Sequence, residues 1–340
     1  MEKIALAGLL PEEIISALSL SQQFRGTQIF EWIAKGAVSF GEMTNISASL
    51  RHELAQKAVL RSCAVSKALR DADGTVKLQI ATGDALAIEA VLLTDKAGRK
   101  TACVSSQAGC PMKCAFCRTG TLGLARNLTT AEIVEQFLFL EKEAGMLDNI
   151  VFMGMGEPLL NLENVRKAIT VLTDKHGRNL SSRRITVSTC GIIEKIYDLA
   201  ENGPHVRLAV SLVTADEAVR KTLMPGAAVP LAGLQKAIAH YSEKSGRRVT
   251  LEAVLLSGVN TSKEAADSLI AFARSLNVHV NLIPWNAVPG LPFKTPPTQE
   301  IADFVSLLEH AGVPATVRIH RGRNVAGACG QLGKTNMPPS

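Results

Sequence analysis

The first sixty residues carry apolar side chains at the spacing of short helices. Pro11-Glu12-Glu13 is a typical helix start, and residues 28–33 and 47–60 place apolar side chains three and four positions apart. We therefore predict a small helical domain over residues 1–60.

The pattern becomes that of β-strands between residues 76 and 93. Polar and apolar residues alternate in Val-Lys-Leu-Gln-Ile, and the nearly continuous apolar run Ala-Ile-Glu-Ala-Val-Leu-Leu follows it. The turn-prone Thr82-Gly83-Asp84 separates the two runs. We predict a hairpin-like connector over residues 61–99.

From residue 100 onward, strand-like runs alternate with helical ones. The expected strands cover residues 101–105, 150–155, 184–188, 206–212, 249–256, 278–283 and 315–319. Between the first two lies a helix over residues 130–144, with a capping box from Thr129 to Glu132 and an end at Gly145. Repeated βα units predict an α/β fold over residues 100–318, as an open doubly wound sheet or as a barrel. In both, ligands collect at the carboxyl ends of the strands.

Composition places this fold in a reducing compartment. The chain has 340 residues and seven cysteines, and we find neither a signal peptide nor an uncharged run long enough to span a membrane. We expect a cytoplasmic protein whose cysteines bind metal or do chemistry.

Charge favours a polyanionic partner only weakly. The formal net charge is +6, which many enzymes without a nucleic-acid role share. Basic clusters that could follow a phosphate backbone, or be ordinary solvated faces, are Arg178 with Arg183 and Arg184, Arg247 with Arg248, and Arg318 with His320, Arg321 and Arg323. Aromatic residues make up 4% of the chain, so a base-stacking platform is not expected.

Three cysteines in one short loop carry the main chemical signal. Cys110, Cys114 and Cys117 are spaced Cys-x3-Cys-x2-Cys, which suits three thiolates around a [4Fe-4S] cluster. The fourth iron is then open to the amino and carboxylate groups of S-adenosylmethionine, whose reductive cleavage gives radical chemistry. The alternatives are a zinc site, which needs a fourth ligand, and a thioredoxin-like pair, which leaves Cys110 without a use.

Further candidates follow the other strands. Gly156 and Glu157 lie in a glycine-rich strand end that could approach the amino group of S-adenosylmethionine or be a structural turn. Ser188, Ser211 and Asn286 end later strands, where a hydroxyl can also cap a helix.

Two more cysteines lie outside the loop. Cys103 ends the first strand of the series, and Cys329 lies in a glycine-rich tail over residues 319–340. They could form a redox pair near the site or be two unrelated buried thiols. Cys63 and Cys190 are expected to be small buried thiols.

Together these motifs resemble the RlmN/Cfr family of radical S-adenosylmethionine RNA methyltransferases over nearly the whole chain. The matching runs are Ile88-Glu89-Ala90-Val91, Cys103 to Cys110 with the loop that follows, Gly154 to Leu160, Asn281 to Asn286, and Ala328 to Leu332. The resemblance implies a partial (β/α)6 radical-SAM barrel with an N-terminal helical accessory domain.

The resemblance also implies a mechanism with two molecules of S-adenosylmethionine per turnover. One methylates Cys329, and the other is cleaved to a radical that takes hydrogen from the new S-methyl group. The methylene radical adds to an adenine carbon, and Cys103 attacks the sulfur of Cys329 to release the product as a disulfide forms. Glu89 matches the proton acceptor of the family. The positions matching cofactor contacts are Gly156, Glu157, Ser188, Ser211, Leu212, Val213 and Asn286, beside the cluster ligands Cys110, Cys114 and Cys117.

The implied partner is RNA. RlmN members modify carbon 2 of an adenine in 23S rRNA and often one in tRNA, whereas Cfr members modify carbon 8. A flavodoxin-type electron donor, a monomeric state and no membrane are further expectations. The chain departs from the family pattern at Val213, where histidine is usual, and at Asn324 and Ala326, where the tail usually has acids. A paralogue with another RNA target, a radical enzyme with a non-RNA substrate, and a zinc-stabilised RNA-binding protein are the alternatives.

Overall fold

One large mixed sheet forms the centre of the computed structural model, which describes residues 3–318 and 321–333. Within these residues, ten strands pair in the order β14-β13-β12-β11-β10-β9-β6-β5-β4-β3. The antiparallel part contains β3 (Ala64–Arg70), β4 (Val76–Ala81), β5 (Ala87–Thr94) and β6 (Lys100–Cys103). The parallel part continues from β6 through β9 (Asn149–Phe152), β10 (Ile185–Thr189), β11 (Arg207–Ser211), β12 (Val249–Leu255), β13 (Val278–Pro284) and β14 (Ala315–Val317).

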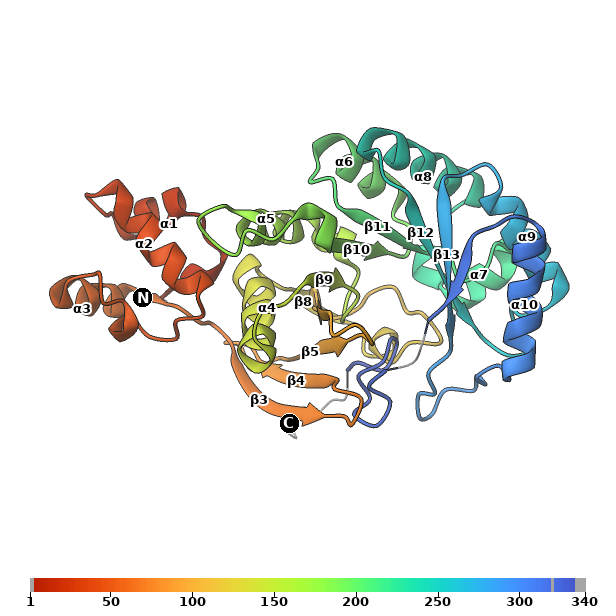
Figure 1. The fold of residues 1–340 in the computed structure, drawn as a ribbon, viewed down its shortest axis with the longest axis horizontal. Helices are drawn as coiled ribbons and strands as arrows, with labels where there is room; N and C mark the ends of the chain where they lie inside the picture. The colour runs from red at the N-terminus through yellow and green to blue at the C-terminus, as the bar shows by residue number, and fades with distance from the viewer. Residues whose placement is uncertain (1–2, 319–320, 334–340) are drawn as a thin grey trace.

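The parallel strands form a partial barrel. They follow chain order without reversal, so every crossover runs in the same direction and the helices lie outside (Figure 1). A doubly wound sheet would reverse its order and carry helices on both faces. The outer helices are α4 (Thr130–Ala144), α5 (Leu162–Thr173), α6 (Ile193–Asn202), α7 (Glu217–Leu223), α8 (Leu231–Ser245), α9 (Lys263–Ala273) and α10 (Thr298–His310). The barrel stays open, because β14 and β3 lie at opposite ends of the strand order.

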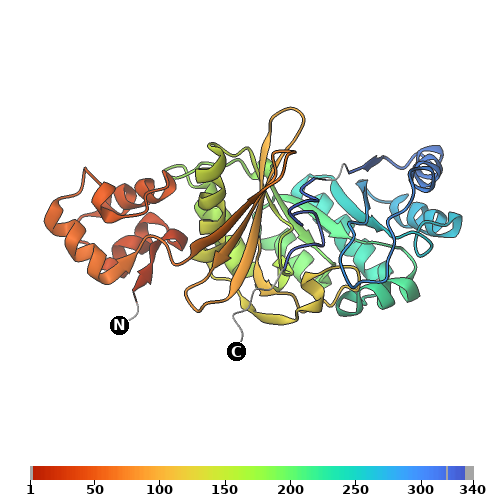
Figure 2. The same cartoon turned by 90° about the horizontal axis from the view of Figure 1, so that it is seen from below.

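The N-terminal residues form a helical unit. It contains α1 (Pro11–Leu18), α2 (Gln23–Ala34) and α3 (Ala48–Lys57), and β1 (Ile4–Ala5) pairs with β2 (Ala58–Val59). These helices lie at the end of the molecule away from α9 and α10 (Figures 1 and 2). Contact with the barrel is close, since a Cβ on Gly8 would come within 2.6 Å of the Ala131 nitrogen in α4.

The connector differs from the expected hairpin by one strand. β4 and β5 form that hairpin, but β3 pairs antiparallel with β4 and extends the sheet. Side chains of β3 are almost all exposed, as at a sheet edge, so the strand lacks the apolar alternation by which a half-buried strand is recognised. None of the helices within residues 3–318 and 321–333 has the length and hydropathy needed to cross a membrane.

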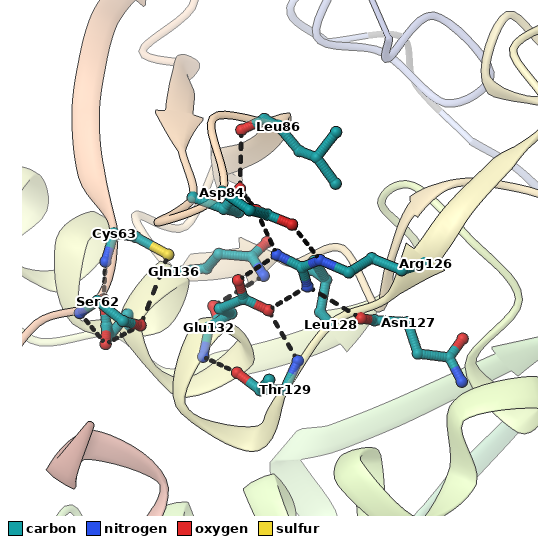
Figure 3. Close-up of polar contacts among 12 residues, drawn as sticks. Ser62, Cys63, Asp84, Leu86, Arg126, Asn127, Leu128, Thr129, Glu132 and Gln136 are labelled. Atoms are coloured by element: carbon teal, nitrogen blue, oxygen red, sulfur yellow. Dashed lines mark hydrogen bonds and ion pairs between the residues drawn. The ribbon is translucent and has the colours of Figure 1, made fainter. Parts of the chain in front are cut away.

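An arginine joins the β4–β5 turn to the start of α4 (Figure 3). Arg126, in β8 (Leu124–Asn127), donates to both carboxylate oxygens of Asp84 at 2.7 Å and to both of Glu132 at 2.7 and 2.8 Å. Glu132 also accepts from the Thr129 backbone nitrogen at 2.8 Å, and the Thr129 hydroxyl caps the helix. The predicted capping box is confirmed, and Arg126 extends it to a second segment.

Arg126→Ala should therefore destabilise the fold. We expect a loss of about 1–3 kcal/mol, because two carboxylates lose a charged donor and Glu132 is buried. The Arg126 hydrogen bonds hold the pKa of Asp84 well below its usual value of 3.8. The stability that Asp84 contributes is thus present above about pH 4 and is lost as the pH falls through the lower pKa of the folded state. Thermal denaturation should show a gap between wild type and variant that is full at pH 7 and shrinks in acid.

Arg99→Ala is the matched control, because its Asp95 partner lies on an exposed turn. We expect no resolvable change in stability, because solvent screens an exposed ion pair. Equal losses in the two variants would contradict the bridging role of Arg126.

Candidate functional site

A cavity of about 970 Å³, including open space at its mouth, lies at the carboxyl ends of the parallel strands. Its wall combines strand ends, the cysteine loop and the C-terminal segment. Predicted site residues in this wall are Cys110, Cys114, Cys117, Gly156, Glu157, Ser188, Ser211, Asn286 and Cys329. The sheet thus brings together residues that lie more than two hundred positions apart in the sequence.

The cysteine loop is held by backbone contacts from three sides. The Cys110 nitrogen donates to the Gly123 oxygen at 2.7 Å, and the Ala115 nitrogen donates to the Leu223 oxygen at 2.8 Å. The indole of Trp285 donates to the Phe116 oxygen at 2.9 Å. These bonds satisfy backbone groups that a short irregular loop would otherwise leave unpaired.

The donor set fits an iron–sulfur cluster. Burial raises the pKa of Cys110 to about 12, and burial also raises the pKa values of Cys114 and Cys117. Such thiols stay protonated until a metal displaces the proton. In the described part of the chain, no group of three or more His, Cys, Asp or Glu side chains is arranged to hold a single metal ion. A cube-shaped cluster needs the three sulfurs around it and not at one point, since each binds a different iron.

Glu157 is buried beside this loop and is already well hydrogen-bonded. One carboxylate oxygen accepts from the Leu159 nitrogen at 3.0 Å, and the other accepts from the Cys190 nitrogen at 2.8 Å and the Cys190 thiol at 2.9 Å. Burial raises the pKa of Glu157. Cys190 is buried as expected, but it also lines the cavity and links Glu157 to the end of β10.

Leu212 and Val213 are not among the residues that line the cavity. Successive side chains of a strand point to opposite faces, so the inward position of Ser211 directs Leu212 into the core. Val213 has φ +64°, which is unusual for a β-branched residue. Asn260 fixes this conformation by donating to the Val213 oxygen at 2.9 Å.

Cys103 and Cys329 line one smaller cavity next to the first. Both are free thiols, and both cavities share Cys329, Asn286 and Arg318. Burial raises the pKa of Cys103 to about 12, and a charged Cys329 would raise it further. The Cys329 sulfur is the largest influence on Arg318, whose pKa it raises. Cys103 and Cys329 therefore line one cavity together with the guanidinium of Arg318.

Glu89 lies outside the lining of both cavities and holds the C-terminal segment. Its carboxylate pairs with the fully buried Lys77 at 3.1 Å and accepts from the Gly333 nitrogen at 2.8 Å. Lys77 in turn donates to the Ala326 oxygen at 3.2 Å. The buried pair therefore fixes the segment on both sides of Cys329.

Asn324, which stands where the family pattern has an acid, contacts a carboxylate of the hairpin region. The Asn324 side chain donates to Asp71 at 2.8 Å, and its backbone nitrogen donates to the same carboxylate at 3.1 Å. An acid at 324 would place two carboxylates in contact, so asparagine suits a chain with Asp71 at this point.

Two charged cavity residues were missed as site residues. Glu252 lines the cavity of the cysteine loop and also a further cavity on the inner face of the barrel. Asn281 donates to the Glu252 carboxylate at 2.7 Å. A lone carboxylate inside the apolar run of β12 was the available signal. Arg318 was expected in a surface cluster but faces the cavities. Arg178, expected in another cluster, pairs with Glu141 at 2.6 Å, and His320 lies outside the described residues.

Comparison with known proteins agrees with this geometry. A family model for the radical SAM superfamily matches residues 104–269, and one for the ribosomal RNA large subunit methyltransferase N-terminal domain matches residues 19–60. The chain is 54% identical to a probable dual-specificity RNA methyltransferase RlmN of Treponema pallidum, over 97% of this chain and 98% of that protein. It is 42% identical to a protein of the same name from Thermus thermophilus, over 95% and 91%. The chain belongs to the RlmN family of radical S-adenosylmethionine RNA methyltransferases.

A solved structure supports the same assignment. The crystal structure of a radical SAM methyltransferase from Sphaerobacter thermophilus superposes with a TM-score of 0.93 at 40% identity, covering 97% of this chain and 99% of that one. The expected fold class is thereby confirmed. Membership of the superfamily implies the [4Fe-4S] cluster and S-adenosylmethionine as cofactors.

Gly120→Ala should impair cluster binding without unfolding the barrel. A Cβ at this position would lie 2.7 Å from the Cys114 oxygen and 2.8 Å from its nitrogen, so the loop would have to move. We expect iron and sulfide per chain, measured after anaerobic reconstitution, to fall by more than half while circular dichroism is unchanged. Gly41→Ala, whose Cβ meets nothing closer than 3.5 Å, should load normally. Full loading of Gly120→Ala would contradict the close packing of the loop.

Proposed function

We propose that this protein methylates carbon 2 of an adenine in 23S rRNA and in tRNA, with Cys329 as methyl carrier and Cys103 as resolving thiol. The observation that carries the proposal is that Cys103 and Cys329 line one cavity beside the cavity of the cluster cysteines. The printed names of the relatives, dual-specificity RNA methyltransferases, support the choice of RNA.

The cysteine loop would hold the cluster, and the strand-end residues Gly156, Glu157, Ser188, Ser211 and Asn286 would hold S-adenosylmethionine. Bound there, these cofactors supply methyl transfer and one-electron cleavage. Each turnover would use two molecules of S-adenosylmethionine, one for methyl transfer and one for one-electron cleavage. The aromatic carbon has no nucleophilic lone pair, which is why simple displacement does not suffice.

The chain itself supplies the carrier and its release. Arg318 lines both cavities together with Cys329 and provides positive charge beside the sulfur that would accept the methyl group. Once the carbon is joined to the base, Cys103 attacks the Cys329 sulfur. The new S–S bond replaces the S–C bond, whose electron pair leaves with the carbon and takes up a proton. Glu89 supports this exchange by holding the tail, because its carboxylate is engaged by Lys77 and Gly333.

A third cavity supports a polyanionic substrate. It opens on the inner face of the barrel, encloses about 1620 Å³ including open solvent, and shares Met153, Glu252 and Arg318 with the cofactor cavity. Its basic residues are Lys96, Arg99, Arg207, His279, Arg318 and Arg321. Phosphates along this wall would guide a splayed adenine towards Cys329.

Cysteine variants test the chemistry. Cys329→Ala should abolish methylation, because the carbon has no carrier. Cys103→Ala should give a covalent protein–RNA adduct visible by gel electrophoresis and mass spectrometry, because nothing breaks the S–C bond. Cys63→Ala, a buried thiol beside Glu135, is the control and should turn over normally. Methylation by Cys329→Ala would contradict the proposal.

Nucleoside mass spectrometry identifies the target. Deletion of the gene should remove 2-methyladenosine from rRNA and tRNA, and the wild-type chain should restore it. Loss of 8-methyladenosine instead would select the Cfr-type reaction, and an unmodified Cys329 after turnover would select a radical enzyme of another kind.

Arg207→Gln should weaken RNA binding without changing the base preference. Arg207 is exposed at the start of β11 on the wall of the third cavity. Loss of one phosphate contact should reduce the slope of log affinity against log salt by about 1. Arg274→Gln, at the exposed end of α9, should leave the slope unchanged. Equal slopes for wild type and the two variants would contradict contact between the RNA and this cavity wall.

A further inference from the structure

Arg220 is the largest fully buried side chain of the described residues, and it lies behind the cysteine loop. Only 1% of its surface is exposed. Its guanidinium donates to the Leu212 oxygen at 3.2 Å, to the Cys190 oxygen at 2.6 Å and to the Ala227 oxygen. These carbonyls belong to the segments after β11 and β10 and to the turn after α7, so one side chain ties three pieces of the cavity wall together.

Carbonyl oxygens satisfy the donors of Arg220 but leave its charge in place. Among the described residues, no Asp or Glu lies within ion-pair distance of the guanidinium. Glu217, the carboxylate that interacts with it, is exposed and accepts from the Leu231 nitrogen at 2.8 Å. Glu157 lies on the other side of Cys190. A buried cation without a partner is costly, so the fold implies an anion that this wall must face.

The element that carries Arg220 also clamps the cysteine loop. The Leu223 oxygen at the end of α7 accepts from the Ala115 nitrogen, and the Gly226 nitrogen donates to the Met112 oxygen at 3.1 Å. Packing is tight, because a Cβ on Gly226 would lie 2.7 Å from the Met112 Cα. The guanidinium and Cys114 interact electrostatically. The short helix α7 and the turn after it therefore fix both the position of the cysteine loop and the position of the Arg220 charge.

We propose that Arg220 is the fixed counter-charge of the iron–sulfur cluster. Three cysteine thiolates make the loaded site anionic, and the reduced cluster is more anionic than the oxidised one. A fixed cation behind Cys114 stabilises both, and stabilises the reduced form more. Cluster charge, hydrogen bonding and exposure are the protein's means of setting the reduction potential. Arg220 is thus a positioning residue that keeps iron bound and makes the cluster easier to reduce.

The test compares variants that separate charge from hydrogen bonding. Arg220→Gln removes the charge and keeps a donor, whereas Arg220→Lys keeps the charge and loses the planar fork. Arg178→Gln is the control, since Arg178 also donates to a backbone carbonyl but belongs to an ion pair away from the cavities. Each protein is reconstituted anaerobically, and the readouts are iron and sulfide per chain, thermal denaturation of the apoprotein, and the midpoint potential from a redox titration followed by electron paramagnetic resonance.

We expect Arg220→Gln to shift the midpoint potential to more negative values and to lose iron faster to a chelator, with Arg220→Lys closer to wild type in potential. Arg178→Gln should match wild type. A wild-type potential in Arg220→Gln would overturn the proposal, and so would equal shifts in the Gln and Lys variants, because the effect would then follow from the lost hydrogen bonds.

If Arg220→Gln fails to fold, Glu217→Gln decides the question. The amide oxygen can still accept from Leu231, but the negative charge beside Arg220 is gone. At low ionic strength the potential should then shift to less negative values, and an unchanged potential would overturn the proposal. Because no readout uses RNA, the proposed RNA methylation stands or falls separately.

Discussion

The docking of the C-terminal segment against the sheet is the interaction on which the site depends. Residues 321–333 have little secondary structure of their own, so their position comes from side chains and backbone groups elsewhere in the chain. Asp71 and Asp73 accept from the start of the segment, and Glu89 accepts from its end. In both views the blue C-terminal segment lies beside the orange antiparallel strands (Figures 1 and 2). The hairpin region is therefore part of the scaffold of the candidate site and not only a connector.

The same segment also contacts the cysteine loop. The Arg118 nitrogen donates to the Gly330 oxygen at 2.7 Å, and the Thr119 hydroxyl donates to the Leu332 oxygen at 2.7 Å. Asn286 donates to the Cys329 oxygen at 3.2 Å. Cys329 is thus positioned through its own backbone and its neighbours, which leaves its sulfur free to form and break bonds. The methyl-carrier role proposed for Cys329 needs this combination, because the sulfur would meet three different partners in one turnover.

The sequence predicts the barrel strands well because the spacing of apolar residues and the turn residues between elements indicate the same boundaries. The strands at 249–255 and 278–284 are apolar runs between helices, and they lie where they were expected. The edge strand β3 was missed because its side chains face water. The cysteine loop could be recognised because its three cysteines lie close together in the sequence. The place of Arg318 could not be found, because only the curvature of the sheet brings an arginine after β14 to the same cavity as β12. For Glu252 the sequence offered only a lone carboxylate within an apolar run. Glu89 was singled out by resemblance as a proton acceptor, and that role stays a prediction; its contacts with Lys77 and Gly333 depend on long-range packing that no local pattern encodes.

The buried charges around the cavities follow one electrostatic rule. Lys77 and Glu89 form a pair within the protein, so they can hold the tail whether or not a ligand is bound. Arg220 and Arg318 instead lie beside sulfurs, and both interact with cysteine side chains more strongly than with any carboxylate. Thiols are neutral until they bind iron or give up a proton, so the protein builds in the positive charge before its partner becomes negative. The two cations thus lie beside Cys114 and beside Cys329, the two cysteines for which a cluster-binding role and a methyl-transfer role are proposed.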